Sequence, residues 1–224
     1  MDGANPLQPD ILFALGPVPI SRAVATTWGI VAALGLGAWL AMRRPRLDPG
    51  PVQAMLEIVV ETIATQVSDI AGKPGARLLP LLATLFLFLA FANLSAVLPG
   101  VQAPTAHIET PAALALVVFF SVHYFGIRGK GLRGYLAHYL RPSPLMLPLN
   151  VLAEITRTFS LMIRLFGNMM SHEIVIAIVA LLAGLFVPIP FLLLGILIGL
   201  IQAYIFTVLA AVYLGAAIGS VQAE

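Results

Sequence analysis

Arg164 lies in the middle of a long apolar run, within the stretch Ser-Leu-Met-Ile-Arg-Leu-Phe-Gly-Asn-Met. A charged side chain at the centre of a bilayer costs at least about 2.5–3.5 kcal/mol on insertion scales. A guanidinium cannot avoid this cost by losing its proton, because it stays charged in proteins. We therefore expect this cation to have a function, and the partner that suits it is a carboxylate or an anionic substrate.

Other polar side chains share a face with Arg164 if the segment is helical, because a helix turns by about 100° per residue. Lipid cannot satisfy the hydrogen bonds of such a polar seam, so the seam must face protein or water. It either joins helices within a bundle or lines a path for an ion or a substrate. The members that fall within about 40° of one line are Asn150, Glu154, Arg157, Arg164, Asn168 and His172, with Ser171 near the edge.

Several of these residues have a structural as well as a functional interpretation. Glu154 and Arg157 are three residues apart and can form a structural ion pair. Arg164 has no carboxylate three or four positions away, which favours a functional role. His172 can titrate near neutrality or can simply be hydrogen-bonded. Glu173, nine residues after Arg164, points about 180° away from it and is either a proton relay or a hydrogen-bonded structural group.

The last apolar helix carries a second polar face. Gln202, Phe206, Leu209 and Tyr213 fall within about 40° of each other at helical spacing. The glutamine and the tyrosine can hydrogen-bond to groups of the preceding segment, Arg164 included, or can serve helix packing alone. The Gly195-x-x-x-Gly199 pair on the same helix is typical of close helix packing.

Composition assigns the chain to the membrane proteins. Of its 224 residues, 60% are hydrophobic and 10% are charged, and the mean hydropathy is +0.99. A soluble domain has about 25% charged residues. The basic residues cluster beside apolar runs, which is typical of membrane topology and not of nucleic-acid binding. Because the sequence has no cysteine, no phosphate-binding Gly-Lys-Ser/Thr loop, no metal-ligand spacing and no nucleophilic triad, it predicts no enzyme and no cofactor.

The elements that must position these residues are helices. We expect an all-α polytopic membrane protein, a single integral domain over 1–224, with the last two helices long and tilted. Residues 1–21 do not have the pattern of a signal peptide, and Pro188-Ile189-Pro190 is expected to form a turn. The positive-inside rule places the N-terminus outside and the C-terminus in the cytoplasm. The expected spans are 24–42, 78–98, 111–127, 148–187 and 191–217, with an amphipathic interfacial helix over 52–70.

Several motifs resemble those of subunit a of F-type ATP synthases. The signature is Arg-Leu-Phe-Gly-Asn-Met at 164–169, preceded by Pro-Leu-Asn at 148–150 and Glu-Ile-Thr-Arg at 154–157. The stretches 202–206 and 212–214 are similar to the C-terminal motif of that family, and Pro-Thr-Ala at 104–106 is similar to its outer-loop motif. The resemblance extends over residues 24–214.

The resemblance implies two tilted helices that wrap a rotating ring of c subunits, with Arg164 as the fixed cation facing the ring carboxylates. Two half-channels would carry the ion, a proton or in a minority branch sodium, past Asn168, His172, Glu173, Gln202 and Tyr213. It also implies b subunits of a peripheral stalk as partners, an inner bacterial membrane as location, and no bound nucleotide or nucleic acid. The sequence departs from the family at three positions: His107 replaces a frequent aspartate, His172 a small residue, and Gly195 a titratable group.

Two other functions are compatible with the residues. In a stand-alone transporter, Arg164 would clamp an anionic substrate, although such folds often have internal inverted repeats and the sequence has none. In an assembly scaffold, the polar seam would only hold helices together. Co-purification with a proteolipid ring distinguishes the first alternative, and ion flux after neutral substitutions along the seam distinguishes the second.

Overall fold

The structure is a computed structural model that describes residues 11–15, 18–43, 50–71, 73–98, 101, 103–140, 145–184 and 187–219. Its regular elements in these ranges are helical apart from one hairpin near the N-terminus. The hairpin pairs strand β1 (Ile11–Leu15) antiparallel with strand β2 (Val18–Ser21). The sequence analysis did not anticipate these strands.

Within the described ranges, five helices are long and apolar enough to cross a membrane, which confirms the expected all-α polytopic architecture. The amphipathic segment forms a further helix that packs beside them. The long helices are α1 (Arg22–Met42), α2 (Pro51–Ala71), α3 (Leu79–Leu94), α4 (Glu109–Leu140), α5 (Met146–Ala183) and α6 (Pro188–Ile218). Short 3₁₀ turns lie at η1 (Lys73–Arg77), η2 (Ser95–Val97) and η3 (Pro104–Ala106).

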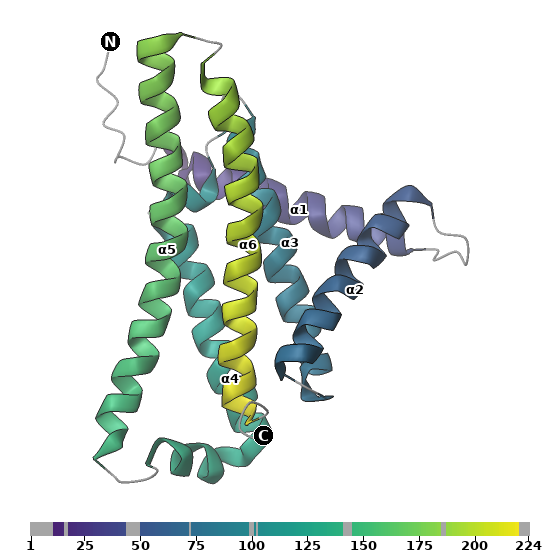
Figure 1. Ribbon diagram of the computed structural model, residues 1–224, viewed down its shortest axis with the longest axis vertical. Helices are drawn as coiled ribbons and strands as arrows, with labels where there is room; N and C mark the ends of the chain where they lie inside the picture. Colours follow the sequence, from purple (N-terminus) through teal and green to yellow (C-terminus); the bar gives the residue numbers. More distant parts are fainter. Residues whose placement is uncertain are drawn as a thin grey trace.

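The two last helices dominate the shape of the molecule. Figure 1 shows α5 and α6 running antiparallel along the long axis, with α3 and α4 behind them and α1 at a large angle to both. The 38 residues of α5 correspond to about 57 Å of helix, whereas the hydrocarbon core of a bilayer is about 30 Å thick. The helix is therefore long enough to extend well beyond the apolar layer.

The turn between α5 and α6 differs from the expectation. Helix α5 ends at Ala183, and the next residue, Gly184, has φ 75°, a conformation that glycine adopts readily. Pro188 to Pro190, expected to be the turn, instead form the first turn of α6. Proline is tolerated there because the first N–H groups of a helix have no partner within the helix.

Helix α4 also extends thirteen residues beyond the expected end at Ile127. The chain breaks direction at Gly131, where φ is 74°, and the following segment turns across the base of the molecule (Figure 1). Its Tyr135 ring packs directly against Gly126, where a Cβ atom would overlap the ring. Of the basic residues that follow the expected span, Arg128 and Lys130 therefore still belong to the first part of α4, and Arg133 belongs to the segment that folds back.

Buried apolar residues fix how α5 is rotated about its axis. Leu161, Leu165 and Met169 recur every four residues and are almost fully buried against the rest of the bundle. Small residues on α6, such as Ala203 and Ala210, are fully buried and let the neighbouring helices approach closely. This packing leaves the opposite side of α5 outside the core.

A buried polar network joins α3, α6 and η3. The Asn93 side-chain amide, 2% exposed, donates a hydrogen bond to the Gly199 carbonyl at 2.9 Å. The Thr105 hydroxyl is fully buried and donates a hydrogen bond to the side-chain oxygen Oδ1 of Asn93 at 2.8 Å. Buried polar groups that are fully hydrogen-bonded make a specific connection, because an unpaired one is costly. The outer loop is thereby fixed to the two helices.

The amphipathic helix α2 packs against α6. Ile63 and Val67, two members of the expected apolar face, are buried, while Met55 at the beginning of the helix is 67% exposed. The Tyr204 hydroxyl donates to the Gln66 side-chain oxygen at 3.1 Å and joins the two helices. Among the described residues, burial on the apolar face is therefore greatest in the second half of α2.

We expect Gly199→Leu to destabilise the bundle, since a Cβ atom at this position would lie 3.0 Å from the Asn93 Cβ. Overpacking of this kind costs about 1–3 kcal/mol, and the Asn93 hydrogen bond would be lost with it. The midpoint of thermal unfolding of the purified protein in detergent measures the effect. Gly35→Leu on α1, where nothing lies within 4 Å, is the control. Equal midpoints for the two variants would contradict this packing.

Candidate functional site

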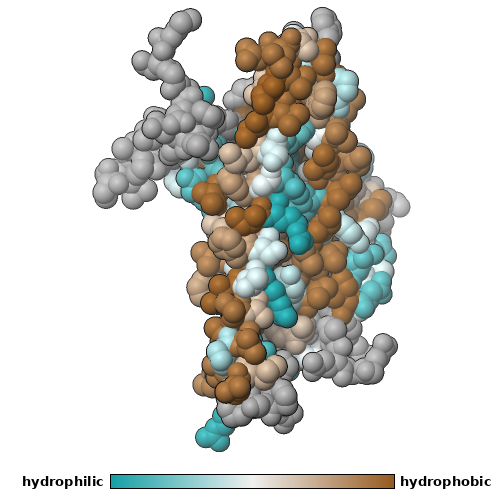
Figure 2. Space-filling view, turned by 60° about the vertical axis from the view of Figure 1, so that its left-hand side comes forward, coloured by the Kyte–Doolittle hydropathy of each residue, from teal (hydrophilic) through white to brown (hydrophobic). Residues whose placement is uncertain are grey.

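An exposed polar stripe runs along α5 beside the face that carries its buried residues. It consists of Arg157, Ser160, Arg164, Asn168 and Ser171, all of which are exposed. Figure 2, which turns the α5 side of the molecule forward, shows a hydrophilic band between hydrophobic flanks. The expected seam thus divides in two. Arg164 and Asn168 lie on the exposed side, whereas Glu154 and His172 at its other edge are partly buried.

Arg164 has no hydrogen bond or ion pair with any residue in the part of the chain that the structure describes. Its neighbours Leu161 and Leu165 are held in the core, so the arginine is directed outward from α5. A cation in this position is available to a negative group outside this chain. The described helices therefore supply no carboxylate that pairs with Arg164.

Asn168 and Gln202 connect α5 to α6 one helical turn from Arg164. The Asn168 amide donates a hydrogen bond to the Gln202 side-chain oxygen at 2.7 Å. Gln202 is 3% exposed, and its own amide nitrogen has no partner among the described residues. An unmade hydrogen bond at a buried group costs about 1–3 kcal/mol. The amide nitrogen is therefore placed to donate a hydrogen bond to water.

Glu173 points to the other side of α5, as its spacing predicted, and meets the loop before α4. Its carboxylate accepts a hydrogen bond from the backbone N–H of Ala103 at 3.1 Å. The His107 imidazole lies close enough to interact electrostatically with the same carboxylate. Glu173 is half-buried, so the structure places an acid and an imidazole together at the outer-loop end of the bundle.

His172 occupies the space that Gly195 leaves on α6. A Cβ atom on Gly195 would overlap the His172 ring, and the histidine Nε2 has no hydrogen-bond partner in the described ranges. Two of the three departures from the family pattern are therefore in contact with each other. The imidazole on α5 fits because the residue opposite it on α6 has no side chain.

Three buried side-chain nitrogens lack a hydrogen-bond partner in the described part of the chain, and each comes from a different element. They belong to His107, His172 and Gln202. Buried polar groups are usually satisfied by protein or by ordered water. Together with Glu173 and Asn168, these groups form a series of polar side chains that leads from the η3 loop to the level of Arg164.

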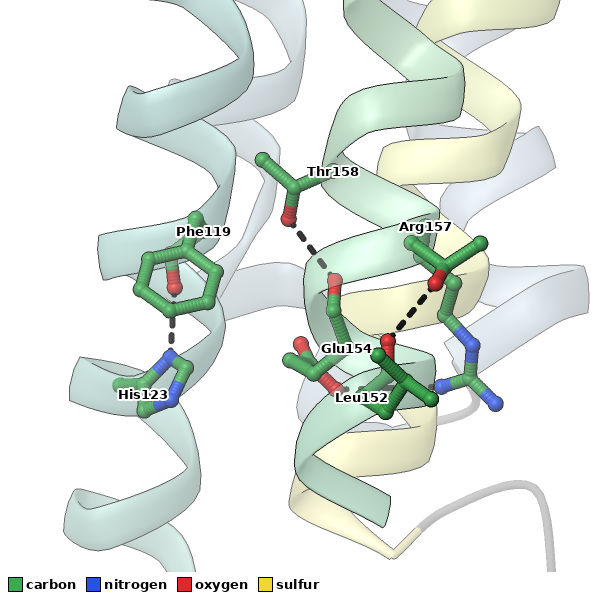
Figure 3. A network of polar contacts seen from close by, with 7 residues as sticks. Phe119, His123, Leu152, Glu154, Arg157 and Thr158 are labelled. Carbon is green, nitrogen blue, oxygen red and sulfur yellow. Dashed lines mark hydrogen bonds and ion pairs between the residues drawn. The ribbon is translucent and has the colours of Figure 1, made fainter. Parts of the chain in front are cut away.

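Tyr213 contacts the preceding helix at Arg157 and not at Arg164. Its ring faces the Arg157 guanidinium, with 5.6 Å between the ring centroid and the arginine Cζ. Arg157 also forms the predicted ion pair with Glu154, with 3.9 Å between nitrogen and oxygen. Figure 3 shows this pair on α5. The same view shows His123 on the neighbouring helix α4, where its ring is hydrogen-bonded to the backbone carbonyl of Phe119 one turn earlier. Tyr213 reaches Arg157 because α6 runs antiparallel to α5.

Sequence reasoning missed the contribution of α3 and η3 to this region. Asn93, an isolated amide inside an apolar span, was the available signal, and it now connects Thr105 to α6. The backbone N–H of Ala103 could not be found from residue types, because it becomes a donor to Glu173 only through the fold. Among the described residues, no three acidic or histidine side chains are grouped as a metal site would require.

Comparison with known proteins gives a consistent result. The family model described as ATP synthase A chain matches residues 24–215. A protein named ATP synthase subunit a 2 from a Bradyrhizobium species is 61% identical over 218 residues, which is 97% of this chain and 98% of that protein. The protein of the same name from Pelobacter propionicus is 55% identical over 95% of this chain and 93% of its own length. ATP synthase subunit a from Moorella thermoacetica is 42% identical over 93% of this chain and 95% of its own length.

We expect Gly195→Ala to lower the stability of the protein by about 1–3 kcal/mol, because overpacking against the His172 ring forces the helices apart. Adding His172→Ala to this variant should restore most of the loss, since it removes the overlapping ring. Thermal unfolding in detergent measures both effects. Gly167→Ala, at a position with nothing within 4 Å, is the control and should be neutral or slightly stabilising. If Gly195→Ala matches this control, the contact does not exist.

Proposed function

This chain belongs to the ATP synthase A chain family, and on that premise we propose that it translocates the coupling ion between two half-channels and a rotating ring. Membership of the family makes it a subunit of the membrane sector of an F-type ATP synthase. It is an integral protein of the bacterial inner membrane, and its role there is non-catalytic. The ion path, the ring and the orientation argued below are the proposal.

The observation that carries this proposal is the exposed, unneutralised Arg164. Its guanidinium stays protonated at any physiological pH and has no acidic partner within the described helices. A carboxylate carried by a ring of c subunits is the complementary group. On arrival beside Arg164, that carboxylate is stabilised in its ionised form, so it releases its ion before the ring moves on. Because the arginine cannot lose its own proton, it also blocks a direct leak between the two half-channels.

The outer half-channel follows the polar groups between the η3 loop and Arg164. In our proposal the ion enters near His107 and Glu173, passes His172, and reaches Gln202 and Asn168. The nitrogens of His107, His172 and Gln202, which have no partner in the described ranges, support a hydrated path, because such groups require water if they are not hydrogen-bonded to protein. Glu173 is held in place by the Ala103 backbone N–H and serves as a relay.

The inner half-channel begins on the other side of Arg164. Glu154, Arg157 and Tyr213 form the polar cluster at this end of the α5–α6 pair. We assign the exit of the ion to this cluster, with the C-terminus and the basic end of α4 in the cytoplasm and the N-terminus outside. An ion that moves down the membrane potential through both half-channels releases about 2.3 kcal/mol of free energy per charge per 100 mV. This free energy drives rotation.

Protons are the coupling ion that the residues favour. The proposed outer path contains two imidazoles and one carboxylate, which exchange protons readily. The ring would lie against the exposed stripe of α5, and the b subunits of the peripheral stalk would contact other parts of the bundle. ATP itself would form in another sector of the complex.

Arg164→Ala tests the central step. The interaction that offsets the cost of placing this cation within the membrane is about 2.5–3.5 kcal/mol or more, which corresponds to roughly a hundredfold in rate. We expect ion-driven ATP synthesis by the assembled complex in proteoliposomes to fall by at least that factor. Arg133→Ala, which removes an exposed arginine outside the proposed path, should leave synthesis unchanged. Normal synthesis by an assembled Arg164→Ala complex would exclude the mechanism.

Glu173→Gln tests the outer half-channel. A positioned proton-transfer group typically contributes about 10²–10⁴-fold. Water in the path replaces part of this contribution, so we expect ion flux through the complex to decrease by about tenfold or more. Flux is measured as the decay of an imposed proton gradient in proteoliposomes. Glu109→Gln, an exposed acid at the beginning of α4, provides the comparison. Unchanged flux would assign Glu173 to packing alone.

A further inference from the structure

Two arginines that have no acidic partner among the described residues line a pocket at the end of the molecule opposite the η3 loop. Arg77 ends η1, immediately before α3, and Arg128 lies on α4. Together with Phe125, Gly129 and Ile218 they line a pocket of about 520 Å³. Its volume falls within the range of about 300–1,000 Å³ that is common for ligand sites. None of these residues belongs to the proposed ion path.

The positive charge of this pocket is not compensated by the described residues. Arg77 makes no hydrogen bond or ion pair there. Arg128 donates one hydrogen bond, to the Tyr124 hydroxyl at 2.6 Å, which leaves most of its five N–H donors available. The nearby Lys130 side chain lies against Gly219 at the C-terminal end of α6. The pocket therefore presents donors and positive charge without a carboxylate to bind them.

The position of the pocket in the fold suggests what binds it. Ile218 is the last residue of α6, and Gly129 lies two residues before the break in α4. The pocket is thus at the level where apolar helices give way to basic residues, which is the headgroup level of a bilayer. Phe125 and Ile218 form an apolar wall beside the two guanidinium groups. Such an arrangement is complementary to an amphiphile with an anionic head.

We propose that this pocket binds the phosphate of an anionic phospholipid. Guanidinium groups bind phosphate oxygens through paired, charge-assisted hydrogen bonds, and basic pockets between membrane helices are suited to anionic headgroups. The lipid phosphate lies between Arg77 and Arg128, and the upper part of an acyl chain lies along Phe125 and Ile218. Gly129 lies beside Ile218 in the lining, where a Cβ atom would make an ordinary van der Waals contact at 3.5 Å. The bound lipid connects η1, α4 and α6 at one end of the bundle.

Photolabelling of the whole purified complex tests this site. A phosphatidylglycerol with a photoreactive group near the headgroup should label peptides containing Phe125–Gly129, and unlabelled phosphatidylglycerol should compete. Arg77→Gln with Arg128→Gln should reduce this labelling by at least about tenfold, while Arg133→Gln should retain it. Arg77→Lys with Arg128→Lys keeps the charge but not the paired geometry, and should give an intermediate level.

Several results would overturn the proposal. Equal labelling by a phosphatidylcholine probe would mean that the site does not select an anionic head. Competition by millimolar inorganic phosphate as strong as by phosphatidylglycerol would make it a free-phosphate site. Loss of another subunit from the double variant with labelling retained would make it a protein interface. The competition experiment on the unmodified complex still decides the question if the variants fail to assemble. None of these outcomes tests the proposed role of Arg164 in ion transport, because labelling does not depend on ion flux.

Discussion

The positive charge of Arg164 imposes the constraint on which the rest of the structure depends. Lipid cannot solvate a guanidinium, and the group cannot be neutralised by losing a proton. The described helices provide no carboxylate for it. Its partner must therefore come from outside the chain, and the surface around it must accept that partner. The burial of three apolar residues of α5 keeps this surface exposed, because it fixes the rotation of the helix about its axis and leaves the polar stripe outside the core. These residues are Leu161, Leu165 and Met169.

Glycines on α6 make room for the polar groups that accompany this cation. The Gly195-x-x-x-Gly199 pair would ordinarily allow two helix backbones to approach each other. Here each glycine receives a polar side chain instead: Gly195 accommodates the His172 ring, and Gly199 lies against Asn93 and accepts its hydrogen bond. The next polar residue on this face, Gln202, bonds to Asn168. A single face of α6 thereby gathers side chains from α3 and α5.

The polar groups on either side of Arg164 differ in chemistry. Toward η3 they are an acid, two imidazoles and two amides, of which three nitrogens have no partner in the described ranges. Toward the beginning of α5 they form an ion pair and a cation–π contact, in which Glu154, Arg157 and Tyr213 satisfy one another. This asymmetry matches two paths that meet at a cation but do not connect. The pocket between Arg77 and Arg128 lies apart from both.

The sequence alone determined the number of apolar helices, the placement of Arg164 in one of them and the orientation of Glu173 away from it. These properties follow from hydropathy and from the helical repeat, both of which are local along the chain. Only the tertiary structure decided which side of the polar seam is exposed, that His172 rests on Gly195, that Tyr213 faces Arg157, and that Asn93 and the Ala103 N–H take part. It also decided that α4 continues past Ile127, because Tyr135 finds its packing partner, Gly126, only after the chain has turned back. Contacts between residues distant in sequence depend on how helices rotate and pack against one another, and that information is not present in any single segment.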